Sequence, residues 1–265
     1  MLMTQNHIKT QLTRARHVLA HVLVIGGAAA ILWHGTAALD YRWRWGQIPR
    51  YFFYRSDGEW KAGPLIEGLI TTLQLSFVSG AMAVILGLVV AAAVLSPRPS
   101  LRLLAGGYTT FMRGTPLLVQ LYILYFMFGN ALSFDRFWAG AAALAMFEGA
   151  FAAEIIRGGI AAVPGGQNEA AAALGLPRLA RWRQVLLPQA MPLILPPLAN
   201  LVVSLIKHSS IVTVIAIADL TDSARNLISE TFLTFEIWLT VGAMYVVICL
   251  PAARVITAWE RRLRR

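Results

Sequence analysis

Apolar residues gather in six runs along this chain, and each run is close to the length that crosses a lipid bilayer. A membrane-spanning helix needs about 20 consecutive, mostly apolar residues. The runs contain few charged side chains, and polar or proline-containing stretches separate them. This pattern predicts an all-α, polytopic integral membrane protein with about six transmembrane helices, at residues 17–34, 68–95, 108–128, 137–160, 191–216 and 237–257.

The first run, residues 17–34, is the shortest and allows two interpretations. Ala28, Ala29 and Ala30 are small residues of the kind found at the cleavage sites of signal peptides. We expect an uncleaved membrane anchor, and a signal peptide is the alternative. The stretch that follows, 40–64, is a polar loop rich in Trp and Tyr, which are typical of the membrane–water interface.

One connection between apolar runs differs from the others. From Pro164 to Pro188 the chain reads PGGQNEAAAALGLPRLARWRQVLLP. Asn168 is a residue type that caps helices, the alanines after Glu169 favour a helix, and Gly175 can end it in a left-handed turn. We therefore predict a first short helix that Asn168 caps and that Gly175 ends.

A second short helix is predicted to follow, with Pro177 at its first position, where proline is well tolerated. Its apolar residues recur three and four apart and fall on one face, whereas its arginines fall on the other. Two amphipathic helices joined at a glycine, held between membrane spans on a water-facing side, have the shape of a docking element for another protein. The apolar face comprises Leu179, Trp182 and Leu186, and the basic face comprises Arg178, Arg181 and Arg183.

Composition and charge support a membrane protein. The chain is 57% hydrophobic and 14% charged, whereas about a quarter of the residues of a soluble domain are charged. Its net charge is +10, but the basic residues concentrate in both tails, in 98–113 and in 157–183, and the acids concentrate in the other loops. The positive-inside rule places the side of the membrane that holds these basic segments, and with it the docking stretch, in the cytoplasm. Membrane topology therefore explains the charge without nucleic acid.

Several kinds of chemistry are not expected. The single Cys249 excludes an internal disulfide, and no lysine follows the glycine spacing of a phosphate-binding loop, so we do not expect this chain to hydrolyse ATP by itself. The five histidines are scattered along the chain, and we predict no metal site. His208 is followed by Ser209 and Ser210, but neighbouring residues on a helix do not face each other. We predict no catalytic residue.

A motif in the docking stretch carries a resemblance. This motif consists of Glu169-Ala170-Ala171, then Gly175, then Leu187-Pro188. It resembles the EAA motif of the membrane subunits of bacterial ABC importers, with Val185 where the family usually has Ile. An ordinary amphipathic connector is the alternative. The resemblance implies that the loop 164–190 forms a coupling helix that sits in a groove of a cytoplasmic ATPase subunit. The residues implied in this contact are Glu169, Ala170, Ala171, Gly175, Leu187 and Pro188.

Other stretches resemble the permeases of polar amino acid uptake systems, of the histidine, glutamine, glutamate and arginine type. They include GLITTLQLSF, AEIIRGGIAAVPGGQNEAAAALG and LPQAMPLILPPLANLVVSLIKHSS, and the similarity covers about 65–258. The RGTP stretch from Arg113 to Pro116 and the LPPLAN stretch at 195–200 are particularly typical. His208 departs from the pattern, because the family usually has Asp or Asn there.

The resemblance implies a type I ABC importer with a transmembrane domain at 65–258, preceded by a tail, first span and periplasmic loop at 1–64 and followed by a basic tail at 259–265. Two permease subunits, identical or related, would form the pathway. A dimer of ABC ATPase subunits would bind ATP and Mg, a periplasmic binding protein would deliver the amino acid, and this chain would hold no cofactor. The expected location is the bacterial inner membrane, with both termini cytoplasmic. The alternatives are an ion-gradient-driven secondary transporter and an intramembrane enzyme.

Ionisable side chains within a bilayer are costly, so each is a functional candidate. Glu148 lies near the middle of its predicted span, and Lys207 also lies within a span. We expect Glu148 to face the pathway and to contact the ammonium or a cationic side chain of the substrate. A carboxyl that is protonated, or paired with Lys207, is an equally open alternative. Ser209 and Ser210 are further candidates for the pathway.

Three other charged residues have expected structural roles. Glu154 and Arg157 are three apart on one helix face and can pair, and contact with the substrate is the alternative. Arg113 lies near an interface and can extend its guanidinium toward water, or contact the docking loop. The arginines of the docking loop face either an acidic ATPase surface or lipid headgroups, so membrane lipid is a further expected partner.

Small residues and prolines also mark the predicted spans. Ser76, Gly80 and Gly87 suit the close approach of another helix. A proline within a membrane helix removes a backbone hydrogen bond, which neighbouring helices or water must replace. Such prolines open the span predicted at 191–216, at Pro192, Pro196 and Pro197.

Overall fold

The computed structural model describes residues 26–27, 41–129 and 135–263. Contacts divide the chain into two units, Met1–Trp45 and Gly46–Arg265, and the second unit is the one described below. The predicted first span at 17–34 lies outside the described residues, apart from two glycines. Its existence therefore stays a prediction.

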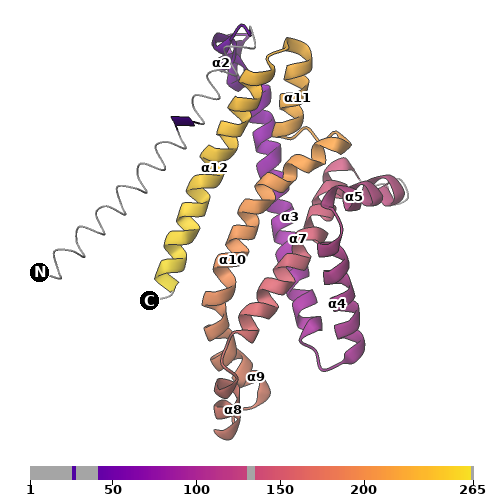
Figure 1. The fold of residues 1–265 in the computed structure, drawn as a ribbon, viewed down its shortest axis with the longest axis vertical. Coiled ribbons are helices and arrows are strands. Elements are labelled where there is room, and N and C mark those ends of the chain that lie inside the picture. Colours follow the sequence, from indigo (N-terminus) through magenta and orange to yellow (C-terminus); the bar gives the residue numbers. More distant parts are fainter. Residues whose placement is uncertain (1–25, 28–40, 130–134, 264–265) are drawn as a thin grey trace, which may run out of the picture. The chain divides into compact units, whose positions relative to one another are not determined.

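Long helices build the second unit, and the predicted all-α membrane fold is confirmed. Four helical stretches of the described residues are long and apolar enough to cross a membrane, and a bent pair of helices adds a fifth if it counts as one span. Figure 1 shows α3, α10 and α12 as long helices that run along the unit. The four stretches are α3 (Pro64–Val94), α7 (Arg136–Ala161), Arg178–Ile215, which contains α10 (Leu187–His208), and α12 (Thr234–Leu263).

The bent pair corrects the prediction of a straight span at 108–128. Its arms, α4 and α5 with the π-helical continuation η2, meet at 109°. Thr115 is extended, with φ −119° and ψ 146°, because the ring of Pro116 disfavours the helical region for the residue before it. The helix therefore starts earlier than predicted and turns at Thr115. The bounds are Pro99–Gly114 for α4, Leu117–Tyr122 for α5 and Ile123–Gly129 for η2.

Gln120 holds this bend together. Its side-chain amide donates to the carbonyl of Met112 at 2.8 Å and to the hydroxyl of Thr115 at 2.7 Å. The bond to Met112 satisfies a carbonyl near the end of α4 that a continuous helix would have paired within its own backbone. The elbow is thus a built feature of the fold.

Small residues bring α3 against α7. A Cβ atom added at Gly87 would lie 3.1 Å from the backbone nitrogen of Ala153 and closer still to the Cβ of Ala152. Ser76 is 2% exposed, and Gly80 faces a side chain of α10. The predicted role of these small residues in close packing is confirmed. The three prolines predicted in the following span lie inside α10, which stays helical.

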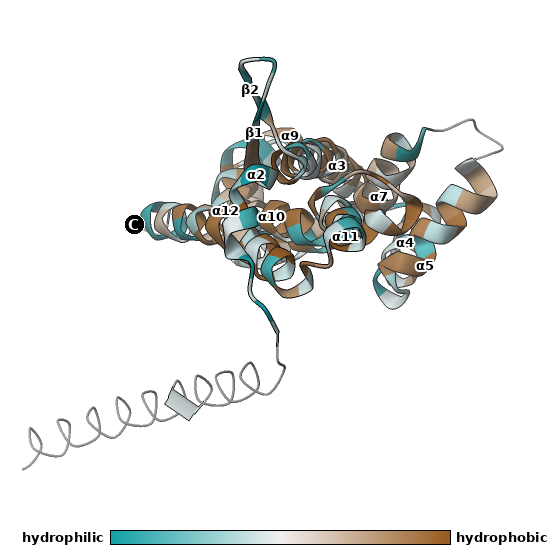
Figure 2. Ribbon diagram, turned by 90° about the horizontal axis from the view of Figure 1, so that it is seen from above, coloured by the Kyte–Doolittle hydropathy of each residue, from teal (hydrophilic) through white to brown (hydrophobic). Residues whose placement is uncertain are grey.

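The end of the unit that holds the start of α3 carries short elements. A hairpin pairs β1 with β2 in antiparallel register, within the loop predicted at 40–64. Leu65 of α3, Leu220 of α11 and Leu233 are fully buried in one apolar cluster there. Figure 2 shows hydrophobic colour along α3 and α5 and hydrophilic colour at the hairpin tip. The short elements are η1 (Trp45–Gln47), α2 (Pro49–Phe52), β1 (Phe53–Ser56), β2 (Glu59–Ala62) and α11 (Leu220–Thr231).

Asp219 caps α11 from a buried position. Its side chain accepts a hydrogen bond from the backbone N–H of Asp222 at 2.9 Å, and the residue is 0% exposed. Loss of water around the carboxyl raises the pKa of Asp219 to about 6, although bonds from backbone N–H groups act in the opposite direction.

Candidate functional site

The stretch predicted as a docking element forms two short helices at the end of the unit opposite α11 (Figure 1). The first, α8 (Gly165–Ala173), ends as predicted at Gly175, whose φ is +77°. The N–H of Leu176 donates to the carbonyl of Ala171 at 3.1 Å, and that of Gly175 donates to Ala172 at 2.9 Å. This is the Schellman motif, in which a left-handed residue lets the last carbonyls of a helix find donors.

Two details of the predicted helix starts are wrong. Asn168 does not cap α8, because Pro164, with ψ 129°, is already the extended cap residue and the helix begins at the glycines. Asn168 lies inside α8, and its side-chain oxygen accepts a hydrogen bond from Arg181 at 3.3 Å. Pro177 is likewise an extended cap with ψ 154°, so the second helix begins one residue later, at Arg178.

The second helix is not separate from the span after it. The second short helix, α9, runs through the π-helical turn η3 and α10 into η4, giving a helical stretch of 38 residues. Pro188 does not interrupt it, because it follows directly after the π-helical turn η3, where the usual i→i−4 hydrogen bonding is already altered and its missing N–H is tolerated. The predicted apolar face is also divided, since Leu179 is 78% exposed whereas Leu186 packs against the core. The bounds are Arg178–Arg181 for α9, Trp182–Leu186 for η3 and Ser209–Ile215 for η4.

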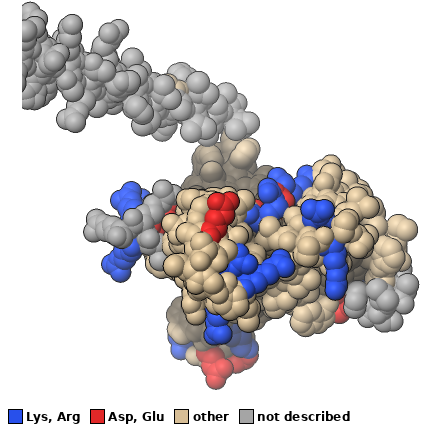
Figure 3. Space-filling view, turned by 90° about the horizontal axis from the view of Figure 1, so that it is seen from below, with Lys and Arg blue, Asp and Glu red and all other residues tan. Residues whose placement is uncertain are grey.

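Most residues of the EAA-like motif are available to a partner. Ala171 is buried at 4% and anchors α8, and Leu174 beside the motif is 81% exposed. Figure 3 looks onto this end of the unit and shows basic side chains spread across it. Exposed apolar residues such as Leu174 and Leu179, with charged residues beside them on short helices, fit a protein docking surface. The exposed motif residues are Glu169, Ala170, Gly175, Leu187 and Pro188.

A charged cluster lies on α7 near the docking loop. The predicted pair is present, with Arg157 donating to Glu154 at 3.0 Å. Arg113 of α4 approaches the same carboxylate at 3.6 Å, and its guanidinium lies 5.4 Å from the ring centre of Phe151. Arg113 therefore ties the bent pair to α7, which is a structural role.

The mid-span carboxylate has a partner that the sequence did not indicate. Glu148 of α7 is 3% exposed, and its Oε1 lies 2.5 Å from Nδ1 of His208 at the end of α10. The proposed alternative of a pair with Lys207 is wrong, because α10 turns His208 toward α7 and leaves Lys207 exposed. Contact between Glu148 and a substrate stays a prediction.

The two serines beside this pair bond within their own helix. Ser209 is fully buried and donates to the carbonyl of Ile206 at 2.8 Å. Ser210 donates to the carbonyl of Lys207 at 2.7 Å. Neither hydroxyl is bonded to the imidazole of His208, so the arrangement lacks the base contact that activates a serine nucleophile. In the described part of the chain, no group of three or more potential ligands gathers as a metal site would.

His208 and Gln120 are the residues that the sequence did not single out correctly. Its sequence context presents His208 only as a base for its neighbouring serines, and its departure from the usual Asp or Asn is the one signal of another role. Gln120 gave no signal of its own, because its role depends on the bend after Gly114. His208 acts through a contact 60 positions away along the chain, whereas Gln120 acts through contacts across the bend that precedes it.

Apolar spans, an exposed helical loop between two of them and a buried polar pair within the bundle define a membrane transport subunit. The chain belongs to the family of binding-protein-dependent transport system inner membrane components, whose sequence model matches residues 83–265. It is therefore a multi-pass inner membrane protein and an ABC importer permease subunit, and the resemblance of its motifs is confirmed.

Individual relatives agree with this family. The chain is 39% identical to the arginine transport system permease protein ArtQ of Bacillus subtilis, over 76% of this chain and 92% of that one. It is 37% identical to the octopine transport system permease protein OccM of Rhizobium radiobacter, over 74% of this chain and 84% of that one. It is 35% identical to the putative glutamine transport system permease protein GlnP of Rickettsia conorii, over 75% and 92%.

Solved structures share the fold. A chain of an amino acid ABC transporter crystallised with histidines is 41% identical, with a TM-score of 0.71 over 75% of this chain and 94% of that one. A chain of the inward-facing MetNI methionine ABC transporter matches with a TM-score of 0.66 at 20% identity, over 76% and 96%. The match to the methionine transporter shows a shared fold alone.

Proposed function

We propose that this chain is the permease subunit of an ATP-driven importer that moves a polar amino acid across the inner membrane into the cytoplasm. The single observation that carries the coupling part of this proposal is the exposed docking loop, whose Glu169 and Ala170 stand free on α8. The relatives named for arginine, octopine and glutamine transport support a polar amino acid as the substrate.

A separate ATPase subunit is the partner of this loop in the proposal. The contact would use Glu169, Ala170 and Gly175, together with Leu187 and Pro188 at the start of α10. The ATPase would bind ATP and Mg, and this chain would need no cofactor. The loop and both termini would then lie on the cytoplasmic side, which agrees with the basic side chains at this end.

Two further partners complete the assembly. A second permease subunit, identical or related, would close the pathway, and a periplasmic binding protein would deliver the amino acid. The domain boundaries expected from the sequence, 1–64, 65–258 and 259–265, remain part of this proposal. The family match begins within α3, at residue 83.

The pathway in the proposal passes the polar pair between α7 and α10. The side chain of His208 is 40% exposed, whereas that of Glu148 is 4% exposed. A substrate would therefore meet the imidazole first, and an ammonium group would have to compete with His208 for the carboxylate. Lys207, Ser209 and Ser210 are neighbouring candidates, of which Lys207 is exposed.

The test is coupled transport by a charge-reversal variant. We would reconstitute the chain with its ATPase subunit and binding protein and measure ATP hydrolysis together with uptake of a labelled amino acid. Glu169→Lys should lower uptake about thirtyfold or more, because removing one charged contact from a docked interface costs about 2–5 kcal/mol. The control is Gln184→Lys, which adds a positive charge at an exposed position of η3. Equal uptake by the two variants would contradict the proposal.

A further inference from the structure

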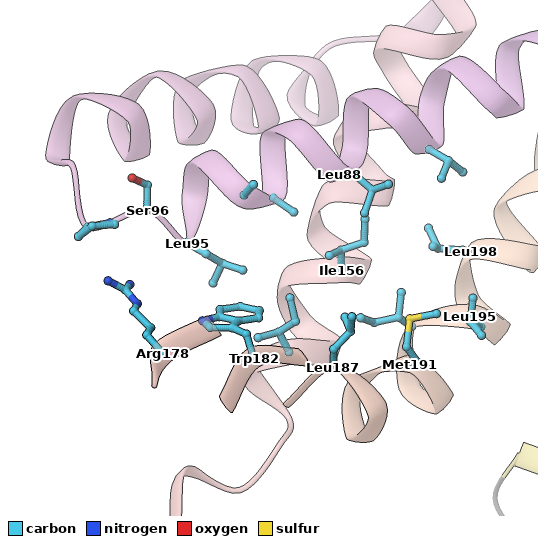
Figure 4. Close-up of a pocket in the computed structure, with 16 residues that line it drawn as sticks. Leu88, Leu95, Ser96, Ile156, Arg178, Trp182, Leu187, Met191, Leu195 and Leu198 are labelled. Atoms are coloured by element: carbon cyan, nitrogen blue, oxygen red, sulfur yellow. The ribbon is translucent and has the colours of Figure 1, made fainter. Parts of the chain in front are cut away.

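A large apolar cavity opens beside the docking loop. It has a volume of about 640 Å³ and lies between the last turns of α3 and the first turns of α10, with α7 behind it. Figure 4 shows Leu88, Ile156, Met191 and Leu195 pointing into it from three helices. Cavities of roughly 300–1,000 Å³ hold small organic ligands in proteins, so this one is large enough for part of a ligand molecule.

The mouth of the cavity has a different character. Arg178, Trp182 and Ser96 line it at the end where α3 stops and α9 begins. Figure 4 shows the side chain of Arg178 extending toward the turn that holds Ser96. No hydrogen bond or ion pair joins Arg178 to another described residue, whereas Arg181 in the same helix bonds to Asn168. A positive charge without a partner among the described residues therefore stands over an apolar chamber.

The apolar chamber and its charged mouth lie at the depths in the membrane of a lipid's acyl chains and of its headgroup. The lining of the chamber comes from the helices that cross the bilayer. Trp and Arg at the ends of such helices lie at the level of the headgroups, with their polar atoms toward water. Hydrocarbon is the natural occupant of an apolar space that opens at this depth, because water would find almost no hydrogen-bonding partner there.

Charge argues against the chain's own first apolar run as the occupant. Residues 1–39 contain Lys9, Arg14 and Arg16 and no acidic residue. A segment of this kind would bring no counter-charge to Arg178. A phosphate-bearing headgroup would, and basic residues near a membrane surface favour anionic lipids.

We infer that this cavity is a binding site for a glycerophospholipid with an anionic headgroup, whose acyl chain enters between α3 and α10 and whose phosphate pairs with Arg178. The site abuts the start of the 38-residue helical stretch that joins the docking loop to α10. A bound lipid would therefore fill the space between the loop and the spans. This inference does not depend on the transported substrate.

Two variants separate the acyl-chain part of the site from the headgroup part. Ala92 lines the cavity and is exposed, so Ala92→Trp fills it without entering the packed core. Val89→Trp is the matched control, since Val89 is 63% exposed on the same helix and does not line the cavity. Arg178→Gln removes the charge at the mouth, and Arg183→Gln removes an exposed charge from the same loop.

The measurement is native mass spectrometry of the detergent-solubilised assembly, titrated with phosphatidylglycerol and, separately, with phosphatidylcholine. We expect the wild type and both control variants to retain phosphatidylglycerol in preference to phosphatidylcholine. Ala92→Trp should lose retention of both lipids. Arg178→Gln should lower the preference for phosphatidylglycerol about fivefold, the size expected for one basic residue beside an anionic headgroup.

Three results would overturn the inference. The first is equal lipid retention by Ala92→Trp and Val89→Trp, which would place the bound lipid elsewhere. The second is an unchanged headgroup preference in Arg178→Gln. The third is a wild type that retains no lipid while a chain lacking residues 1–40 does, which would show that the first apolar run fills the cavity.

Discussion

The carboxylate of Glu148 and the imidazole of His208 meet between two membrane helices, with Oε1 and Nδ1 2.5 Å apart. The residues lie 60 positions apart in the chain, and the ring of Phe147 packs edge-on against the imidazole at 6.1 Å between ring centres. A buried carboxylate needs such a partner, because removing a charge from water without compensation is costly. The pair joins α7 to α10 at the point where α10 gives way to η4.

The first prediction concerns this pair. His208→Leu leaves a buried carboxyl group without a partner and should lower the free energy of unfolding by about 1–3 kcal/mol. That value is below the range for fully buried pairs, because the histidine is partly exposed. Thermal unfolding of the solubilised assembly measures it.

The double variant Glu148→Leu/His208→Leu should recover most of the lost stability, since both polar groups are then absent. Ser210→Ala is the control, because its hydroxyl bonds only within its own helix. A double variant that is less stable than His208→Leu would show that the pair does not hold the two helices together.

Helix packing gives the second prediction, from two glycines with opposite surroundings. Gly87→Ala places a methyl group against Ala152 and the backbone of Ala153, and it should cost about 1–3 kcal/mol through overpacking. Gly106→Ala places the same methyl group in α4 with no heavy atom within 4 Å, and it should be neutral or stabilising by up to about 1 kcal/mol. The measurement is the midpoint of thermal unfolding of each variant. Equal midpoints for Gly87→Ala and Gly106→Ala would contradict the close α3–α7 contact.

The third prediction tests the turn of the docking loop. Gly175 has a φ of +77°, which proline cannot adopt because its ring fixes φ near about −65°. Gly175→Pro should therefore disrupt the turn, and in the proposed function it should uncouple ATP hydrolysis from uptake. The measurement is moles of amino acid transported per mole of ATP hydrolysed in proteoliposomes.

Gly165→Pro is the matched control for this variant. Gly165 is the first residue of α8, where proline is favoured, and the space around it is open. Coupling should stay at the wild-type level in this variant. If Gly175→Pro also coupled normally, the shape of the loop would be irrelevant to transport.

A fourth prediction follows from the buried cap of α11. The pKa of Asp219 is about 6 in the folded protein, above its usual 3.8, because burial disfavours the charged form. Below about pH 4 Asp219 holds its proton in both the folded and the unfolded chain, so its titration does not lower the free energy of unfolding there. Between about pH 4 and 6 the unfolded chain loses its proton first, so stability falls by up to about 1.4 kcal/mol per pH unit.

Asp219→Asn removes this titration and keeps a residue that can cap a helix. The stability of the variant relative to the wild type should therefore rise by about 2–3 kcal/mol from pH 4 to pH 7. Unfolding of the solubilised protein at several pH values measures the difference. A difference that does not change with pH would contradict the burial of this carboxyl group.

The predictable parts of the fold were those that local sequence determines. The spans around α3, α7, α10 and α12 followed from runs of apolar residues, and the left-handed turn at Gly175 followed from an alanine-rich helix that ends in glycine. The predicted start of α8 is wrong because two signals for a helix start, Pro164 and Asn168, lie four residues apart and compete. Pro164 with its two glycines prevailed over Asn168, which instead bonds to Arg181.

Features that depend on contacts between distant segments were not predictable in the same way. The apolar run at 108–128 looked continuous, and only the effect of Pro116 on Thr115 gave a local signal of the bend. Pairing of Glu148 with His208 rather than with Lys207 depends on how α10 is rotated against α7. One residue along a helix changes the direction of a side chain by about 100°, and hydrophobic pattern alone does not fix that rotation in a helix with apolar residues on several sides.

The most direct test of the account is uptake by the purified permease in proteoliposomes, with and without its ATPase subunit. Labelled arginine and glutamine would be offered with the binding protein, with ATP on the side of the docking loop and with no ion gradient. We expect accumulation only when the ATPase subunit and ATP are both present. Accumulation by the permease without the ATPase, driven by an imposed ion gradient, would contradict it.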